Sequence, residues 1–156
     1  MTTAHQEFLR EHPVFRQLSG DYHALLAPHM REHAAATGDI LLREGHPAEE
    51  FFILIDGAVD LYAGLGEGDE QWIQMIGPGE VIGWSWLVPP HRWAFGVRAR
   101  VDSRLMRFDA PALRNLCERD PAFGYGTLKR ISALMMERLH TVRSRMAGRI
   151  QGVEAG

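Results

Sequence analysis

Hydrophobic positions change their period twice along the chain, which divides it into three regions and a tail. Residues 1–36 have helical and irregular spacing, and residues 37–108 contain short β-rich runs. Residues 109–147 are helical again, and 148–156 form the tail. The pattern predicts a single, mainly β domain with flanking helices, in which the β-rich runs form a barrel or a jelly-roll sandwich.

The β-rich region consists of five runs separated by Gly, Pro and Asp. They read DILLREG, EFFILIDG, AVDLYAG, QWIQMIGPGE and FGVRARVDSRLMRF. Asp56-Gly57 lies between the second and third runs. This dipeptide predicts a β-hairpin turn of type I′, which requires a positive φ at both central residues.

The helical regions carry apolar stripes. In the N-terminal region one predicted helical face holds Tyr22, Leu25, Leu26 and Met30. Asp109 with Pro111 predicts the start of a short helix, and Asp120-Pro121 the start of a longer one. The longer helix has a narrow stripe of Leu128, Ile131, Met135, Leu139, Val142 and Met146, which favours a homodimer seam over packing within the domain.

The longer helix is also basic. Its cations, opposed by the single acid Glu137, are Lys129, Arg130, Arg138, Arg143, Arg145 and Arg149. We interpret them as a solvated face with cations near a helix C-terminus, where the macrodipole favours them. The alternative is contact with an acidic partner or a nucleic acid.

Composition narrows the class of protein. The 156 residues are 46% hydrophobic and 24% charged, with a net charge of −3, which gives no general reason to expect nucleic-acid binding. The single cysteine, Cys117, fits a reducing cytosol and a buried structural thiol. Neither a secretory signal nor a membrane-spanning apolar run is visible. We therefore expect a cytoplasmic protein without a membrane segment.

Signatures of enzymes and metal sites are missing from the sequence. It contains no P-loop and no Gly-x-Ser-x-Gly motif. His29 and His33 have the i,i+4 spacing of a helical zinc pair, but no Cys or Glu constellation supports them. The strand region offers only His46 and His91, too few for a metal-binding barrel. We predict neither catalytic residues nor a metal or cofactor.

Residues 83–93, GWSWLVPPHRW, hold three of the four tryptophans. With its flanks, the stretch PGEVIGWSWLVPPHRWAFGVRARVDSRLMRFDAPAL resembles the cyclic-nucleotide-binding domain of catabolite-activator-type regulators, kinase regulatory subunits and gated channels. The earlier GDILLREGHPAEEFFILIDGAVDLY is similar to that family's first hairpins. The resemblance covers residues 14–146. It implies an eight-stranded β-roll, a short phosphate-binding helix within segment 79–94, and a C-terminal helix that closes on the ligand or dimerises.

The resemblance also implies a ligand site. Gly83, Arg92 and Ala94 match the glycine, arginine and alanine of the family's phosphate-binding segment. Arg92 is then expected to pair with a cyclic phosphate, and backbone N–H groups at the start of the short helix to bind its oxygens. The complete predicted set is Gly83, Trp84, Ser85, Trp86, Arg92, Trp93 and Ala94.

Two departures from the family pattern concern the ligand. Trp84 occupies the position of a glutamate that accepts a hydrogen bond from the ribose 2′-hydroxyl, an interaction worth about 1.5–3 kcal/mol, or about 10- to 150-fold in affinity. Val142-Arg143 lies where some members place a Thr/Ser pair that contacts the base. The tryptophans therefore have three interpretations: they fill the pocket, form a wall for another anion, or face outward as an interaction surface.

Together these observations predict a stand-alone, non-enzymatic module for signal transduction. It binds a cyclic nucleotide, cAMP or cGMP, or a related anion, and signals through the C-terminal helix to a protein partner that the sequence does not identify. The alternative is a degenerate module with a tryptophan-filled pocket that acts in dimerisation or protein interaction. About ten residues follow Met146, too few for a helix-turn-helix, so direct DNA binding is not expected.

Overall fold

Two four-stranded antiparallel sheets form the β-roll. The computed structural model describes residues 3–64, 68–83 and 85–155, except the side chains of residues 142, 145 and 149–155. One sheet has the order β1-β8-β3-β6, with bounds Met30–Ala35, Ser103–Asp109, Glu50–Asp56 and Val81–Ile82. The other has the order β2-β7-β4-β5, with bounds Ile40–Leu42, Gly96–Ala99, Val59–Ala63 and Gln71–Ile76. The predicted jelly-roll with flanking helices is confirmed.

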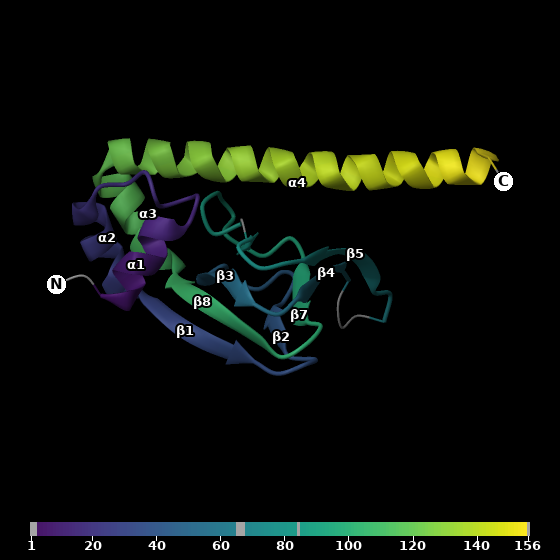
Figure 1. Cartoon of the computed structure of the whole chain (residues 1–156), viewed down its shortest axis with the longest axis horizontal. Helices are drawn as coiled ribbons and strands as arrows, with labels where there is room; N and C mark the ends of the chain where they lie inside the picture. Colours follow the sequence, from purple (N-terminus) through teal and green to yellow (C-terminus); the bar gives the residue numbers. More distant parts are fainter. Residues whose placement is uncertain (1–2, 65–67, 84, 156) are drawn as a thin grey trace.

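Helices cover one end and one side of the roll (Figure 1). Their bounds are α1 Ala4–Glu11, α2 Gly20–Leu26, the 3-10 turn η1 Ala27–His29, α3 Ala110–Arg119 and α4 Pro121–Ala155. Asp109 accepts a hydrogen bond from the backbone N–H of Ala112, as expected of the cap that starts α3. α4 runs along the roll and its C-terminal part continues beyond the strands (Figure 1).

A column of stacked aromatic rings forms the centre of the core. The ring of Phe51 on β3 lies 4.5 Å from Trp86 and 4.6 Å from Phe108 on β8, centroid to centroid. Phe108 in turn stacks on Phe15, which follows α1, at 5.4 Å. The column therefore fixes the segment after β6 to the sheet and to the N-terminal helices. Trp86 is fully buried in it.

Four expectations from the sequence are wrong. β1 occupies Met30–Ala35, within the region expected to be helical, because η1 ends the helix and β8 offers backbone hydrogen-bonding partners. Leu25, expected on the apolar helical face, is 52% exposed. Asp56-Gly57 turns a corner between the two sheets and does not form a hairpin; of the two, Gly57 alone has a positive φ, +106°. The tail expected after residue 147 is helical as far as Ala155.

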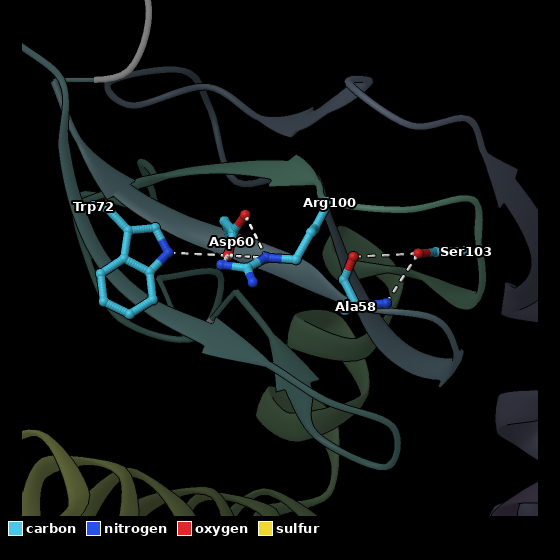
Figure 2. Close-up of polar contacts among 5 residues, drawn as sticks. All are labelled: Ala58, Asp60, Trp72, Arg100 and Ser103. Carbon is cyan, nitrogen blue, oxygen red and sulfur yellow. Dashed lines mark hydrogen bonds and ion pairs between the residues drawn. The ribbon is translucent and has the colours of Figure 1, made fainter.

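Asp60 on β4 is a buried carboxylate whose charge is compensated within its own sheet (Figure 2). Both of its oxygens accept hydrogen bonds from Nε of Arg100 at 3.0 Å, and one also accepts from Nε1 of Trp72 at 2.9 Å. These hydrogen bonds raise the pKa of Arg100 above its ordinary value. The fourth tryptophan of the chain thus stabilises a structural ion pair.

The apolar stripe of α4 is only partly covered by the roll. Ile131 is buried, whereas Leu128, Met135, Leu139 and Met146 are between 44% and 60% exposed, and the side chain of Val142 lies outside the described residues. Dimerisation through this face stays a prediction, which sedimentation velocity can test.

His12 at the end of α1 makes stability depend on pH. Its Nε2 donates to the carbonyl of Gly79 at 2.7 Å, and its Nδ1 accepts from the backbone N–H of Val14. Burial lowers its pKa below the ordinary 6.5, with the Gly79 bond opposing the change. The unfolded chain therefore binds the proton more readily, so the free energy of unfolding is expected to decrease as the pH falls below about 6.5, by at most about 1.4 kcal/mol per pH unit.

Urea unfolding of the wild type and His12→Gln across pH 5–7.5 measures this contribution, because glutamine does not titrate. The slope of stability against pH is expected to be shallower in His12→Gln than in the wild type. His29→Gln, at an exposed position, is the matched control and should keep the wild-type slope. Equal slopes in all three proteins would contradict the assignment to His12.

Candidate ligand-binding site

A cavity of about 480 Å³ lies between the sheet β2-β7-β4-β5, the segment that follows β6, and α4. The walls are mostly apolar: the roll contributes Leu61, Ile76 and Val97, and α4 contributes Met135, Met136 and Leu139. This volume lies in the range of small-molecule sites. Because α4 forms one wall, any occupant touches the roll and the helix at the same time.

Four of the seven predicted ligand residues line this cavity. They are Gly83, Ser85, Trp93 and Ala94, which come from both sides of the Pro89-Pro90 turn. Trp86 and Arg92 are not among the lining residues, and Trp84 lies outside the described residues. The structure thus brings the two ends of the predicted segment together at the cavity.

Trp93 forms a wall of the cavity and is packed against Gly83. A Cβ atom at Gly83 would lie 2.6 Å from the Trp93 ring, and Gly83 has a φ of +94°, a conformation that favours glycine. The backbone N–H and carbonyl of Trp93 are bonded to His46 and Gly45 at 3.0 and 2.8 Å. Gly83 therefore lines the cavity and also packs against an indole ring, and its lack of a Cβ leaves room for that ring.

Arg92 does not line the cavity. Its side chain is exposed, and Nη1 donates a hydrogen bond to the carbonyl of Gly45 at 2.8 Å. The described residues 85–95 also lack the implied helix: residues 85–90 form turns and bends, and Arg92 forms an isolated β-bridge with Pro47. One reason is that Pro89 and Pro90 have no N–H for a helical hydrogen bond. The helix N-terminus expected to bind a phosphate is therefore not formed by these residues.

Two further polar side chains in the cavity wall were not predicted. Gln74 on β5 is 95% buried, and Arg138 on α4 is buried apart from 16% of its side chain. Nη2 of Arg138 donates to the carbonyl of Val81 at 2.8 Å and lies 3.5 Å from Oε2 of Glu80. Burial lowers the pKa of Arg138 from its ordinary value, and Glu80 opposes that change.

The sequence contains a signal for Arg138 that periodicity alone did not reveal. Arg138 follows the buried Ile131 by seven residues, two helical turns, and so faces the same side of α4. Its neighbours Met135 and Leu139 also contact the cavity. An arginine within an apolar stripe indicates a buried contact rather than a solvated face.

A sequence profile of the cyclic nucleotide-binding domain matches residues 32–120. The chain belongs to the cyclic nucleotide-binding domain family. The resemblance seen in the sequence is confirmed, and the cavity occupies the space enclosed by the β-roll and the long helix of this domain.

Solved structures share this domain's fold. A protein of Geobacter metallireducens GS-15 named for cyclic nucleotide binding is 24% identical with a TM-score of 0.80, covering 88% of this chain and all of that one. A cyclic nucleotide-binding domain from Methylobacillus flagellatus KT is 21% identical with a TM-score of 0.74, covering 93% and 82%. Potassium channel KOR1 of Oryza sativa subsp. japonica is 24% identical over 117 residues, 74% of this chain but 14% of the channel.

Cys117, the single cysteine of this cyclic nucleotide-binding domain, is half-buried on α3. Burial, with a smaller effect of Glu118, raises the pKa of the Cys117 thiol to about 11, so at neutral pH the thiol is protonated and a poor nucleophile. Within the described ranges no cluster of three His, Cys, Asp or Glu side chains could hold a metal ion. No described helix is both long and apolar enough to cross a membrane.

Proposed function

We propose that this cyclic nucleotide-binding domain is a regulatory module that binds a small anionic ligand, a cyclic nucleotide or a related anion, in the cavity between the roll and α4. The observation that carries the proposal is the 480 Å³ cavity itself, which Trp86 and Trp93 leave open. The alternative of a tryptophan-filled pocket finds no support, since Trp86 belongs to the core and Trp93 to the wall.

We propose that the module signals through α4, and the support for this is that α4 contributes part of the cavity wall. Met135, Met136, Arg138 and Leu139 all come from this helix. A ligand that contacts them changes the free energy with which α4 packs on the roll, and can shift α4 between positions only by that difference. A protein partner that reads the position of α4 is part of the proposal. The cytoplasmic location predicted from the sequence stays a prediction.

A thermal-shift titration with cAMP and cGMP tests the proposal. Ligand that binds the folded state raises its stability by about 2.7 kcal/mol at 100 times Kd, so the Tm of the wild type is expected to rise with concentration and to saturate. Ala94→Trp is the matched control, because Ala94 is an exposed residue of the lining and its enlargement obstructs the cavity.

A rise in the wild type that is lost in Ala94→Trp supports the cavity as the site. An equal rise in both proteins would place the ligand elsewhere, and no rise at millimolar ligand would reject ordinary cyclic nucleotides as effectors. Arg92 as the phosphate ligand remains a proposal that requires its guanidinium to release the Gly45 carbonyl.

A further inference from the structure

The polarity of the cavity wall specifies more about its occupant than the fold does. Among the described lining residues, Arg138 is the only one with a charged side chain. Gln74 is the other buried polar group, and no described residue donates a hydrogen bond to its Oε1. A buried acceptor without a donor costs about 1–3 kcal/mol, so a ligand that supplies one gains that energy.

We propose that the ligand of this cavity is a mostly apolar acid, whose anionic group is bound by Arg138 on α4 and whose hydrogen-bond donor is bound by Gln74 on β5. This inference rests on the proposed function, and it assigns the anion to a residue of the helix rather than to Arg92 of the loop. The apolar side chains of β4, β5, β7 and α4 then enclose the remainder of the ligand.

Binding at Arg138 couples the ligand to the helix. In the structure the guanidinium holds α4 to the roll through the Val81 carbonyl and the carboxylate of Glu80, which is half-exposed. An arginine forms its strongest hydrogen bonds with an anion, so an acid within the cavity competes with the neutral carbonyl and with Glu80. The ligand therefore replaces a contact that positions α4, which explains how an occupied cavity can move the helix.

Two fluorescent probes separate charge from shape. 8-Anilinonaphthalene-1-sulfonate and N-phenyl-1-naphthylamine share an aromatic body and an N–H donor, and only the first carries a sulfonate. We expect the wild type to bind both probes. Arg138→Met is expected to lower the affinity for the sulfonate probe by about tenfold or more and to leave the affinity for the neutral probe nearly unchanged. Gln74→Leu should lower the affinity for both probes, because the N–H group that the probes share loses Oε1 of Gln74 as its acceptor.

Control variants locate the effect. Arg143→Met removes an exposed cation from the same helix and should leave both affinities unchanged. Ala94→Trp should weaken both probes, which distinguishes the cavity from the exposed apolar face of α4. Glu80→Gln keeps Arg138 and removes its competing carboxylate, so it is expected to tighten sulfonate binding about two- to fivefold even if Arg138→Met folds poorly.

The outcomes separate this inference from the proposed function. The inference is supported if Arg138→Met no longer binds the sulfonate probe more tightly than the neutral probe, as the wild type does, and if Glu80→Gln binds the sulfonate probe more tightly than the wild type. It is overturned if Arg138→Met binds both probes as the wild type does, or if Arg92→Met alone removes the preference for the anion; the cavity then remains a ligand site with another anchor. Failure of the wild type to bind either probe would overturn this inference, whereas the thermal-shift titration with cAMP and cGMP tests the proposed function separately.

Discussion

Replacing Trp86 with alanine is expected to lower the free energy of unfolding by about 3–5 kcal/mol. Trp86 is fully buried and stacks on Phe51 with an interplanar angle of 9°. Its carbonyl also accepts a hydrogen bond from Nη1 of Arg114 on α3 at 2.7 Å. Removing the indole leaves a cavity at the end of the aromatic column and loosens the segment that carries Ser85. For a chain of this size the loss corresponds to a fall in Tm of about 6–20 °C.

Trp86→Phe is the matched variant for this prediction. Phenylalanine keeps an aromatic ring for Phe51 and removes an indole N–H for which no described residue is an acceptor. We expect it to cost about 1–2 kcal/mol, less than the alanine variant. Chemical denaturation of both variants gives the comparison. If Trp86→Ala lost less than about 1 kcal/mol, Trp86 would not be the residue that fixes this segment to the core.

The β-roll could be predicted because its signals are local and repeated. Short β-rich runs separated by turn residues coincide with most of the strands, and Asp109 with Pro111 starts α3 as expected. β1 could not be found in this way. The sequence of Met30–Ala35 has no clear alternation, and this strand forms because β8, more than seventy residues later, supplies its hydrogen-bonding partners. The corner at Gly57 was also missed, because a corner and a hairpin use the same turn residues. Only the pairing of β3 and β4 with strands of different sheets distinguishes the two.

The site was harder to predict than the fold. Resemblance placed Gly83, Ser85, Trp93 and Ala94 at the cavity, because backbone position follows from the fold. It could not show that Arg92 is held by a backbone carbonyl, since the direction of a side chain depends on its tertiary contacts. Gln74 and Arg138 were missed because each is polar within an apolar stretch, and only the packing of α4 against β5 shows that both face one cavity.

Replacing Gly83 with alanine is expected to cost about 2–6 kcal/mol, through two separable effects. A non-glycine residue at φ +94° is strained, which costs about 1–3 kcal/mol. In addition, the new Cβ would lie 2.6 Å from the Trp93 ring and 3.2 Å from Cδ1 of Leu42. Overpacking of this kind costs about 1–3 kcal/mol in a dense core. Because Trp93 forms the wall, the same substitution should also reshape the cavity.

Gly38→Ala isolates the backbone effect, because Gly38 has a similar φ of +91° and no atom within 4 Å of an added Cβ. We expect it to lose about 1–2 kcal/mol, less than Gly83→Ala. Trp93→Leu isolates the contact: in a double-mutant cycle, Gly83→Ala should cost less in the Trp93→Leu background than in the wild type, by about the overpacking energy. Equal losses in the two backgrounds would show that Gly83 is required for its backbone conformation alone. The indole of Trp93 would then have room to move, and the volume of the ligand cavity would not depend on the absence of a side chain at residue 83.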